Sequence, residues 1–479
     1  MIPTYYDLIV VGSSFASTFF LKKYLAKAPA SARVLVLERG HLYPHPERVK
    51  ELRGEKTPYA ALNPDHNDTF INKSAGNKAW RFATGFGGSS NCWVGCTPRF
   101  LPNDFRMKQL YGIAQDWPLD YDDLDPYYDE VETIMSISGP QDTPFPRKGA
   151  YPQPPHQFTT VDKILHEQYG NLYINQPTAR ARTPVGGRNM CCASSTCSLC
   201  PVNAKFTIEN AGMGVYEDPR VELRYGAQVH HLTLAQNRAQ QIHFTEDGKQ
   251  HQATADAFAL GANAIFNAHI LLNSGDANPH TGKGIGEQIG TQVSVYLDKL
   301  ACVGGSTYVP ANGYMLYDGQ HRRHHAACLI ESSNAPFVRM ERGKWRDMAI
   351  FRTVFEELPA AHNYVVPSAD RLKPEVHFQG PSEYVWKGIA NMKQKLPQLF
   401  ACLPVEKMEF GDPFPTESHI LGTTRMSGDP KEGVVDKHLI HHQYRNLFVL
   451  GSGSFTTYTP ANPTLTLSAL SLLAADQSF

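Results

Sequence analysis

The strongest constraint on the fold lies at the start of the chain. An apolar, β-branched run, Tyr5–Val11, leads into a turn at Gly12 and then into a helical stretch over residues 18–28. A second apolar run over residues 33–37 ends in Glu38. Two apolar strands joined by a helix predict a parallel βαβ unit, and an acid at the end of the second strand is typical of dinucleotide-binding folds. The sequence therefore predicts an α/β protein that binds a dinucleotide pyrophosphate at a helix N-terminus.

The first turn departs from the usual glycine fingerprint of such folds. Ser14 and Ser17 stand where the second and third glycines of G-x-G-x-x-G are expected. Serine is small enough to let a phosphate approach the backbone closely. A βαβ crossover that binds no nucleotide is the alternative interpretation of this unit.

Later segments extend the same domain. Strand-like runs at residues 221–229, 241–245 and 255–260 precede a helical stretch at 268–273, and a buried strand is predicted at 446–450. The last helix is expected to begin with Asn462 as N-cap and Pro463 as first helical residue. One nucleotide domain would then take strands from both ends of the chain.

Composition excludes several classes of protein. The 479 residues are 42% hydrophobic and 19% charged, which indicates a globular protein of more than one lobe. Lys and Arg number 45 against 46 Asp and Glu, so no global basic field attracts nucleic acid. No apolar run is long enough for a membrane-spanning helix, and the apolar start continues into a folded unit, which argues against a signal peptide.

Several motifs together resemble the glucose–methanol–choline (GMC) flavoprotein oxidoreductases, and within them the pyranose-oxidase-like and sugar dehydrogenase branch. The N-terminal unit is one motif, and the glycine loop at 84–93 with Thr97-Pro98-Arg99-Phe100 is a second. The most specific lies at the C-terminal end, in residues 418–426, 433–436, 446–450 and 460–466. The resemblance covers about residues 5–290 and 415–479.

The resemblance implies a discontinuous, Rossmann-type FAD-binding domain and a smaller, sheet-based substrate-binding domain. The first would comprise residues 1–294 and 413–479, with family insertions in about 105–220, and the second residues 295–412. It further implies FAD with the ADP half held by Gly12, Ser14 and Glu38, and with adenine at the Val229 backbone. The other FAD-binding positions by resemblance are Gly87, Gly88, Ser89, Ser90, Asn91, Cys92, Gly451, Ser452, Pro463 and Thr464.

Cys92 stands where pyranose oxidases carry a histidine that is covalently attached to flavin. A histidyl bond is therefore excluded at this position. A cysteinyl bond is chemically conceivable, but noncovalent FAD is the prediction.

His419 and Asn462 match the family's catalytic positions. By resemblance, His419 is the general base that takes the hydroxyl proton while hydride passes to flavin N5, and Asn462 is its polar partner. Histidine suits the first role because its ordinary pKa of about 6.5 lies near working pH. The alternative is a buried histidine satisfied by its neighbours, since the chain has 20 histidines. A second histidine-rich segment, residues 321–325, is predicted to be a solvated basic loop.

Four cysteines within ten residues, Cys191, Cys192, Cys197 and Cys200, could surround one soft metal centre. They resemble the segment that binds a three-iron cluster in multi-subunit sugar dehydrogenases of the family, although the last spacing here is one residue shorter. The other interpretation is a loop of inert or pairing thiols. Both stay open.

The sequence thus predicts FAD-dependent oxidation of an alcohol group in a sugar or glycoside. Oxygen or, preferably, another acceptor would take the electrons, either directly or through a small subunit or electron-transfer partner. The protein would be cytoplasmic, or periplasmic through a signal-bearing partner subunit. A non-redox FAD lyase of the same family and a non-catalytic flavin-binding subunit are the alternatives.

Overall fold

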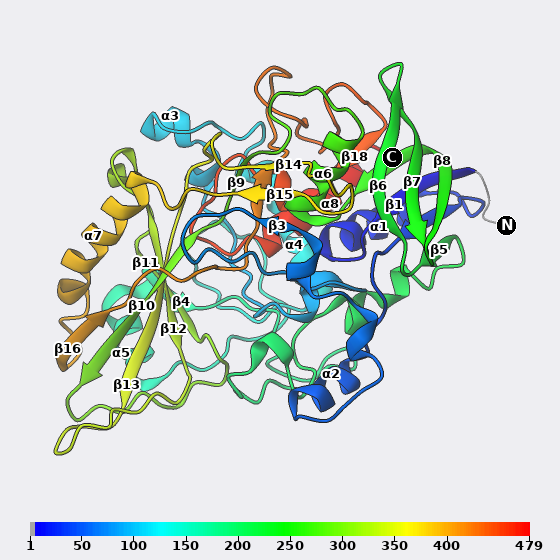
Figure 1. Cartoon of the computed structure of the whole chain (residues 1–479). Coiled ribbons are helices and arrows are strands. Elements are labelled where there is room, and N and C mark those ends of the chain that lie inside the picture. Colours follow the sequence, from blue (N-terminus) through cyan, green and yellow to red (C-terminus); the bar gives the residue numbers. More distant parts are fainter. Residues whose placement is uncertain (1–4) are drawn as a thin grey trace.

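The computed structural model describes residues 5–479 and contains three β-sheets with helices packed around them (Figure 1). Within this range, every helix is too short or too polar to cross a lipid bilayer. Two of the sheets lie at opposite ends of the molecule, and the third lies between them.

The largest sheet is built around the predicted βαβ unit. Its central strand, β1, pairs in parallel with β2 on one side and with β8 on the other. The connecting helix α1 begins at Phe15 rather than at residue 18. In spatial order the strands are β5 (Val221–Arg224), β2 (Val34–Leu37), β1 (Tyr5–Val11), β8 (Lys249–Leu260), β7 (Arg238–Glu246) and β6 (Gln228–Ala235), with β18 (Leu447–Val449) also paired to β8.

Both ends of the chain meet in this part of the molecule, as predicted. Strand β18 pairs in parallel with the end of β8, and the last helix packs beside α1 (Phe15–Lys27). Lys27 forms an ion pair of 2.9 Å with Asp476 at the end of that helix. The helices of this region are α1, α4 (Tyr121–Met135), α6 (Asn263–Asn273) and α8 (Thr464–Asp476), with α2 (His45–Leu52) at the surface.

A six-stranded antiparallel sheet forms the other end of the molecule. Helices α5 (Thr160–Tyr169) and α7 (Glu383–Leu399) pack their apolar faces against it, and α3 (Met107–Tyr111) lies nearby. Its strands in order are β16 (Val405–Phe410), β10 (Ile289–Leu297), β13 (Met348–Phe355), β12 (Cys328–Ser333), β11 (Ala311–Leu316) and β4 (Tyr173–Asn175).

The α/β fold with a second, sheet-based part is therefore confirmed. The expected domain limits do not coincide with the sheets, because residue 294 falls inside β10 and β4 comes from the region expected to be an insertion. Strands β14 and β15 lie within 295–412 but pair into the third sheet. The division into domains stays a prediction.

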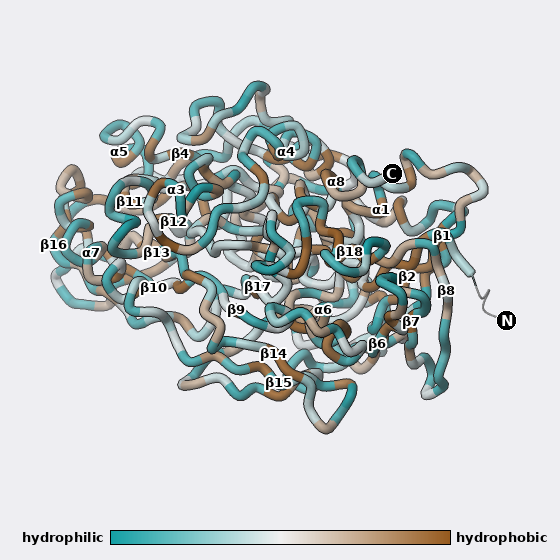
Figure 2. The backbone as a smooth tube through the Cα atoms, turned by 90° about the horizontal axis from the view of Figure 1, so that it is seen from above, coloured by the Kyte–Doolittle hydropathy of each residue, from teal (hydrophilic) through white to brown (hydrophobic). Residues whose placement is uncertain are grey.

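The third sheet connects the other two and carries the segment that follows His419. Its strands are β17 (Leu421–Thr423), β9 (Lys283–Gly286), β14 (Tyr364–Val366), β15 (Glu375–His377) and β3 (Ile71–Asn72). Burial of apolar side chains holds all three sheets in place: brown, hydrophobic stretches lie mainly inside the molecule in Figure 2, and teal ones on its outer loops.

Candidate active site

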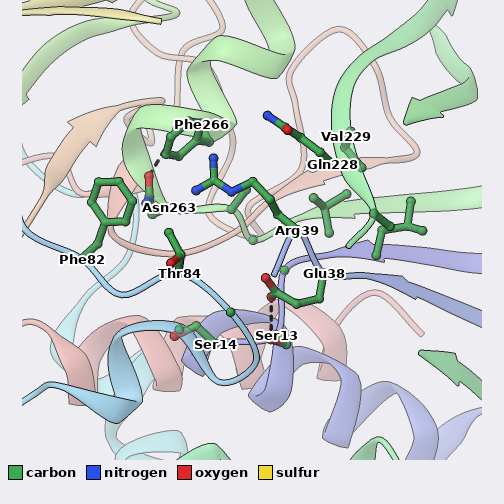
Figure 3. Close-up of a pocket in the computed structure, with 18 of the residues that line it drawn as sticks. Ser13, Ser14, Glu38, Arg39, Phe82, Thr84, Gln228, Val229, Asn263 and Phe266 are labelled. Atoms are coloured by element: carbon green, nitrogen blue, oxygen red, sulfur yellow. Dashed lines mark hydrogen bonds between the residues drawn. The ribbon is translucent and has the colours of Figure 1, made fainter. Parts of the chain in front are cut away.

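A pocket opens where the parallel strands of the largest sheet end. Val11 and Leu37 are neighbours in register at the carboxyl ends of β1 and β2, and both line the pocket. Gly261, which follows β8, lines it as well. The carboxyl edge of a parallel sheet is the usual ligand site in such folds. The pocket is shown in Figure 3.

The turn after β1 brings the backbone close to this pocket. Gly12 has a φ of +86°, and a Cβ atom there would lie 2.7 Å from the carbonyl oxygen of Gly261. Only glycine fits such a position. Helix α1 follows, and its N-cap residue Ser14 makes no side-chain capping bond. The first N–H groups of the helix thus remain available to an anion such as a pyrophosphate.

Glu38 lies opposite this helix end. One of its carboxylate oxygens accepts a hydrogen bond of 2.6 Å from Ser13 Oγ, and the other accepts one of 2.9 Å from Gly40 N. A carboxylate can accept about four hydrogen bonds, so capacity remains for the hydroxyls of a ribose. These features fit the adenosine diphosphate half of FAD, as the family resemblance implies.

Replacing Glu38 with alanine is expected to weaken FAD binding without changing the reactivity of the FAD that stays bound. Hydrogen bonds to a charged group contribute about 1.5–3 kcal/mol each, which corresponds to roughly a 10- to 100-fold rise in Kd. Fluorescence titration of the apoprotein with FAD measures this, with Glu47→Ala as control, because Glu47 pairs with Lys50 on α2 and lies outside the pocket lining. An unchanged Kd would assign Glu38 a purely structural role.

Only part of the glycine loop lines the pocket. Gly88 packs so closely on Ser14 that a Cβ atom would lie 2.8 Å from its side chain, and Ser89 lies beside it on the pocket wall. Gly87 donates its N–H to Ser13 Oγ at 3.0 Å and so holds the loop onto the first turn. The loop therefore closes one side of the nucleotide site.

The remaining predicted loop residues lie outside the pocket lining. Ser90 Oγ accepts a hydrogen bond from Ile208 N, and Asn91 Nδ2 donates to Phe86 O. Cys92 is exposed to solvent. Contact of these three residues with the flavin stays a prediction.

Other side chains of the pocket were not identified from the sequence. Arg39 extends into the pocket, with its guanidinium 4.3 Å from the centre of the Phe266 ring. Phe82, Thr84 and Asn263 also line it. Two of these residues had a local signal in the sequence: Arg39 adjoins Glu38, and Thr84 begins the glycine loop. The others come from distant segments that only the fold brings together.

The predicted Gly451 and Ser452 connect the nucleotide site to the second part of the active site. Gly451 follows β18 and packs against Ala16 in the first turn of α1. Ser452 Oγ donates a 2.6 Å hydrogen bond to the carbonyl of Ile420, the residue after His419. The segment that carries His419 is thereby attached to the edge of the nucleotide site.

His419 is half-buried in this segment. Its Nδ1 lies 3.1 Å from Gln288 Oε1, and its backbone N–H donates to Glu287 Oε2 at 3.3 Å. Burial, together with the nearby charge of Arg352, lowers the pKa of His419 to about 3. The imidazole is therefore neutral at ordinary pH, which is the form that a general base requires.

The segment that carries Asn462 shares a hydrogen-bond partner with His419. The carbonyl of Ala461, the residue before Asn462, accepts a hydrogen bond from the same Gln288. The predicted helix start is wrong by one position: α8 begins at Thr464, and Pro463 takes the cap position. The Oδ1 atom of Asn462 consequently caps nothing and has no hydrogen-bond partner within the described residues.

A buried polar network adjoins Asn462. Burial raises the pKa of Glu331, and the charge of Arg352 and a hydrogen bond with Asn462 partly offset that rise. Gln176 donates to Asn312 Oδ1 at 3.1 Å and to Glu331 Oε1 at 3.3 Å. Asn312 Nδ2, like Asn462 Oδ1, is buried without a partner in the described structure.

Within the described residues, no three His, Cys, Asp or Glu side chains are placed to hold a metal ion, and this includes the four clustered cysteines. Cys197 is buried and Cys192 is exposed, while Cys191 and Cys200 are half-buried. Cys200 Sγ accepts a hydrogen bond of 3.2 Å from Ala204 N. Metal binding by this loop stays a prediction.

The chain is similar to known proteins in sequence and in fold. A family model described as GMC oxidoreductase matches residues 406–471, which include His419 and Asn462. The chain is 28% identical to the fructose dehydrogenase large subunit of Gluconobacter japonicus, over 98% of this chain and 97% of that protein. It is 23% identical to the gluconate 2-dehydrogenase flavoprotein of Pantoea cypripedii, over 58% of this chain and 54% of that protein.

A 2-methyl-1,2-propanediol dehydrogenase of Mycolicibacterium austroafricanum is 25% identical, over 81% of this chain and 80% of that protein. Among solved structures, pyridoxine 4-oxidase from Mesorbium loti superposes with a TM-score of 0.66, covering 98% of this chain and 99% of that one at 15% identity. This last likeness shows a shared fold.

Proposed function

We propose, from the premise that this chain belongs to the GMC oxidoreductase family, that it oxidises an alcohol group of a sugar or glycoside. Membership makes it an FAD-dependent oxidoreductase that acts on alcohol groups. When bound, FAD accepts the hydride that leaves the alcohol carbon. The chain itself must bind the substrate, orient its hydroxyl and take the hydroxyl proton.

The residues near His419 are suited to these tasks. Neutral His419 can accept the hydroxyl proton, and Glu287 holds the backbone N–H of the same residue in place. Asn462 directly follows Ala461, whose carbonyl is held by the same Gln288 that contacts His419. His419 is the proton acceptor in this proposal, and Asn462 orients the reacting hydroxyl.

The observation that carries the sugar assignment is the pair of unpartnered polar atoms in the buried network around Asn462. Asn462 Oδ1 is an acceptor and Asn312 Nδ2 is a donor, and both are buried. A buried polar group without a partner costs about 1–3 kcal/mol, which a ligand can recover. A simple alcohol has one hydroxyl, whereas a sugar offers several hydroxyls that both donate and accept.

Anaerobic reduction of the bound flavin by a panel of sugars, glycosides and simple alcohols tests this proposal. Bleaching of the flavin absorption by sugars or glycosides is expected. Bleaching only by aliphatic or aromatic alcohols would refute the sugar assignment. If no alcohol reduced the flavin, the lyase or the non-catalytic subunit would become the better interpretation.

The names of two relatives support transfer of electrons to an acceptor other than oxygen. One relative is named a dehydrogenase large subunit and another a dehydrogenase flavoprotein. We propose that this chain is likewise a dehydrogenase that works with a partner subunit or an electron-transfer protein. Its location, cytoplasmic or periplasmic with a signal-bearing partner, depends on that partner.

An iron–sulfur centre in the cysteine loop remains a proposal, which the charges around the loop support. Arg180 and Lys205 are both buried and form no ion pair with a carboxylate in the described residues. Lys205 Nζ donates instead to carbonyls that include those of Trp93 and Cys197, at 2.6 and 2.9 Å. Buried cations favour nearby anions, and the thiolates of this loop could supply them.

Replacing Cys197 with serine tests the cysteine loop. If the loop holds iron, the anaerobically purified native protein should contain iron and show a broad visible absorption beside the flavin bands, and the variant should lose both. Turnover with a dye or quinone should exceed turnover with oxygen in the native protein and fall in the variant. Cys402→Ser, at an exposed site outside the loop, is the control. Equal dye turnover in the native protein and in Cys197→Ser would show that these cysteines carry no electrons to the dye.

A further inference from the structure

Two consecutive buried residues between β9 and β10 hold the segment that carries His419. Glu287 Oε2 accepts hydrogen bonds from the His419 backbone N–H and, at 3.1 Å, from Thr416 Oγ1. Its other oxygen is paired with Lys78. Gln288, which is 1% exposed, lies next to it and contacts the imidazole ring itself.

The orientation of the Gln288 side-chain amide follows from its other contacts. Its Nε2 donates to the carbonyl oxygens of Thr459 and Ala461, at 2.8 and 3.1 Å. A carbonyl oxygen can only accept, so the NH₂ end must face these two groups. The amide rotated by 180° would place its oxygen against both carbonyls. Gln288 Oε1 therefore faces His419.

This orientation decides which nitrogen of His419 carries the proton. Gln288 Oε1 can only accept, so Nδ1 of the neutral imidazole must donate to it across 3.1 Å. The lone pair is then on Nε2, for which the described residues provide no hydrogen-bond partner. A general base needs this arrangement: a free lone pair on the nitrogen that faces the substrate.

We propose that Gln288 is a positioning residue that fixes the tautomer of His419 and joins the base to the segment that carries Asn462. The inference rests on the proposed role of His419 in alcohol oxidation. One side chain thus sets both the proton position on the base and the position of residues 459–461, which precede Asn462. Glu287 holds the backbone of the same histidine, while Gln288 holds its ring.

Two variants separate the effect of Gln288 on the His419 tautomer from its effect on the position of residues 459–461. Gln288→Met removes the acceptor for Nδ1 and the donors to Thr459 and Ala461 together. Gln288→Glu keeps an acceptor for Nδ1–H but has no donor for the two carbonyls. Gln153→Met is the matched control, because Gln153 is also buried and accepts from the backbone N–H groups of Arg182 and Thr183.

The first measurement is ¹⁵N NMR of protein labelled in histidine, with the His419 signals identified by their loss in His419→Ala. The native protein should show a proton on Nδ1 and a bare Nε2. Gln288→Met should shift the population towards the other tautomer, and Gln288→Glu should restore the native pattern. This readout needs no substrate, so it stands even if the proposed reaction is wrong.

The second measurement is stopped-flow reduction of bound FAD by substrate. Gln288→Met should slow it by about 10- to 100-fold, the range for metal-binding histidines that lose the hydrogen-bond partner of their other ring nitrogen, which serves as the comparison here. Gln288→Glu should recover part of the rate. Its carboxylate should also raise the pKa of His419, so that the rate falls at low pH where the native rate does not. Its loss of the two carbonyl contacts should raise KM.

A native His419 with its proton on Nε2 would overturn the proposal. So would a Gln288→Met protein that keeps both the native tautomer and the native rate. Flavin content and circular dichroism establish that each variant is folded. If Gln288→Met does not fold, the Gln288→Glu variant tests the proposal instead, through the tautomer of His419 and the pH profile of flavin reduction. If no alcohol reduces the native protein, the proposed function fails while the tautomer result stays informative.

Discussion

His419→Ala is expected to slow the reduction of bound FAD by substrate about 10²–10⁴-fold, the contribution that general-base catalysis makes. FAD binding should be unchanged, because His419 does not line the nucleotide pocket. The pKa of about 3 in the native protein means that His419 stays unprotonated above about pH 5, so the native rate should show no acid-side loss from this group in that range.

His156→Ala is the matched control for this experiment. His156 is also buried, and burial lowers its pKa to about 4, but it hydrogen-bonds Ser306 and the carbonyl of Arg180 away from His419. Anaerobic stopped-flow absorbance measures both variants. A native rate of flavin reduction in His419→Ala would rule out His419 as the proton acceptor.

The second large effect is a loss of folding stability, which is expected when Arg322 is replaced. This side chain is 0% exposed and pairs with Asp104 at 2.9 Å and with Glu356 at 2.6 Å, both of them buried. Arg322→Met leaves two buried carboxyl groups without their cation. Breaking a buried pair in this way costs about 3–5 kcal/mol. The midpoint of urea unfolding should fall accordingly in protein with its full flavin content.

The pH dependence of this loss has a definite sign. Burial already raises the pKa of Asp104 to about 6, against the opposing charge of Arg322. Removing Arg322 raises that pKa further above its unfolded value, so the protonated carboxyl favours the folded state at low pH. The deficit of the variant should therefore be smallest below about pH 6, where Asp104 is protonated in both folded proteins, and should grow as pH rises from there through the higher folded pKa of the variant.

Arg106→Met provides the comparison, because Arg106 is an exposed arginine paired with Asp120 at 3.0 Å. An exposed pair contributes about 0–1 kcal/mol. Equal unfolding midpoints for Arg322→Met and Arg106→Met would show that the buried pairing adds no stability.

Arg322 also illustrates where sequence reasoning fails. Residues 321–325 were expected to be a solvated basic loop, and that prediction is wrong for Arg322, which lies in a buried 3₁₀ turn, Gln320–Arg323. A run of basic residues usually lies in solvent, and nothing local distinguishes one that meets buried carboxyl groups. Its partners, Asp104 and Glu356, come from segments far away in the sequence.

Predictions that rest on local pattern agree better with the structure. The strands at Tyr5–Val11 and Val34–Leu37, the turn at Gly12 and the acid at Glu38 all lie where the sequence placed them. The N-terminus of the last helix was off by one residue, since Pro463 rather than Asn462 takes the cap position. That small shift matters, because it leaves Asn462 Oδ1 without a capping role.

The sequence by itself determined the βαβ unit, the acid that faces the nucleotide pocket and the identity of the candidate base. Strand hydrophobicity, glycine conformation and short motifs act over a few residues, so they can be identified along the chain. Only the tertiary structure decided that Gln288 faces His419, that Arg39 enters the nucleotide pocket and that Asn312 lies in the polar network near Asn462. Those contacts join different sheets and loops, and long-range packing selects them, because a side chain's hydrogen-bond partners depend on which distant segments are buried against it.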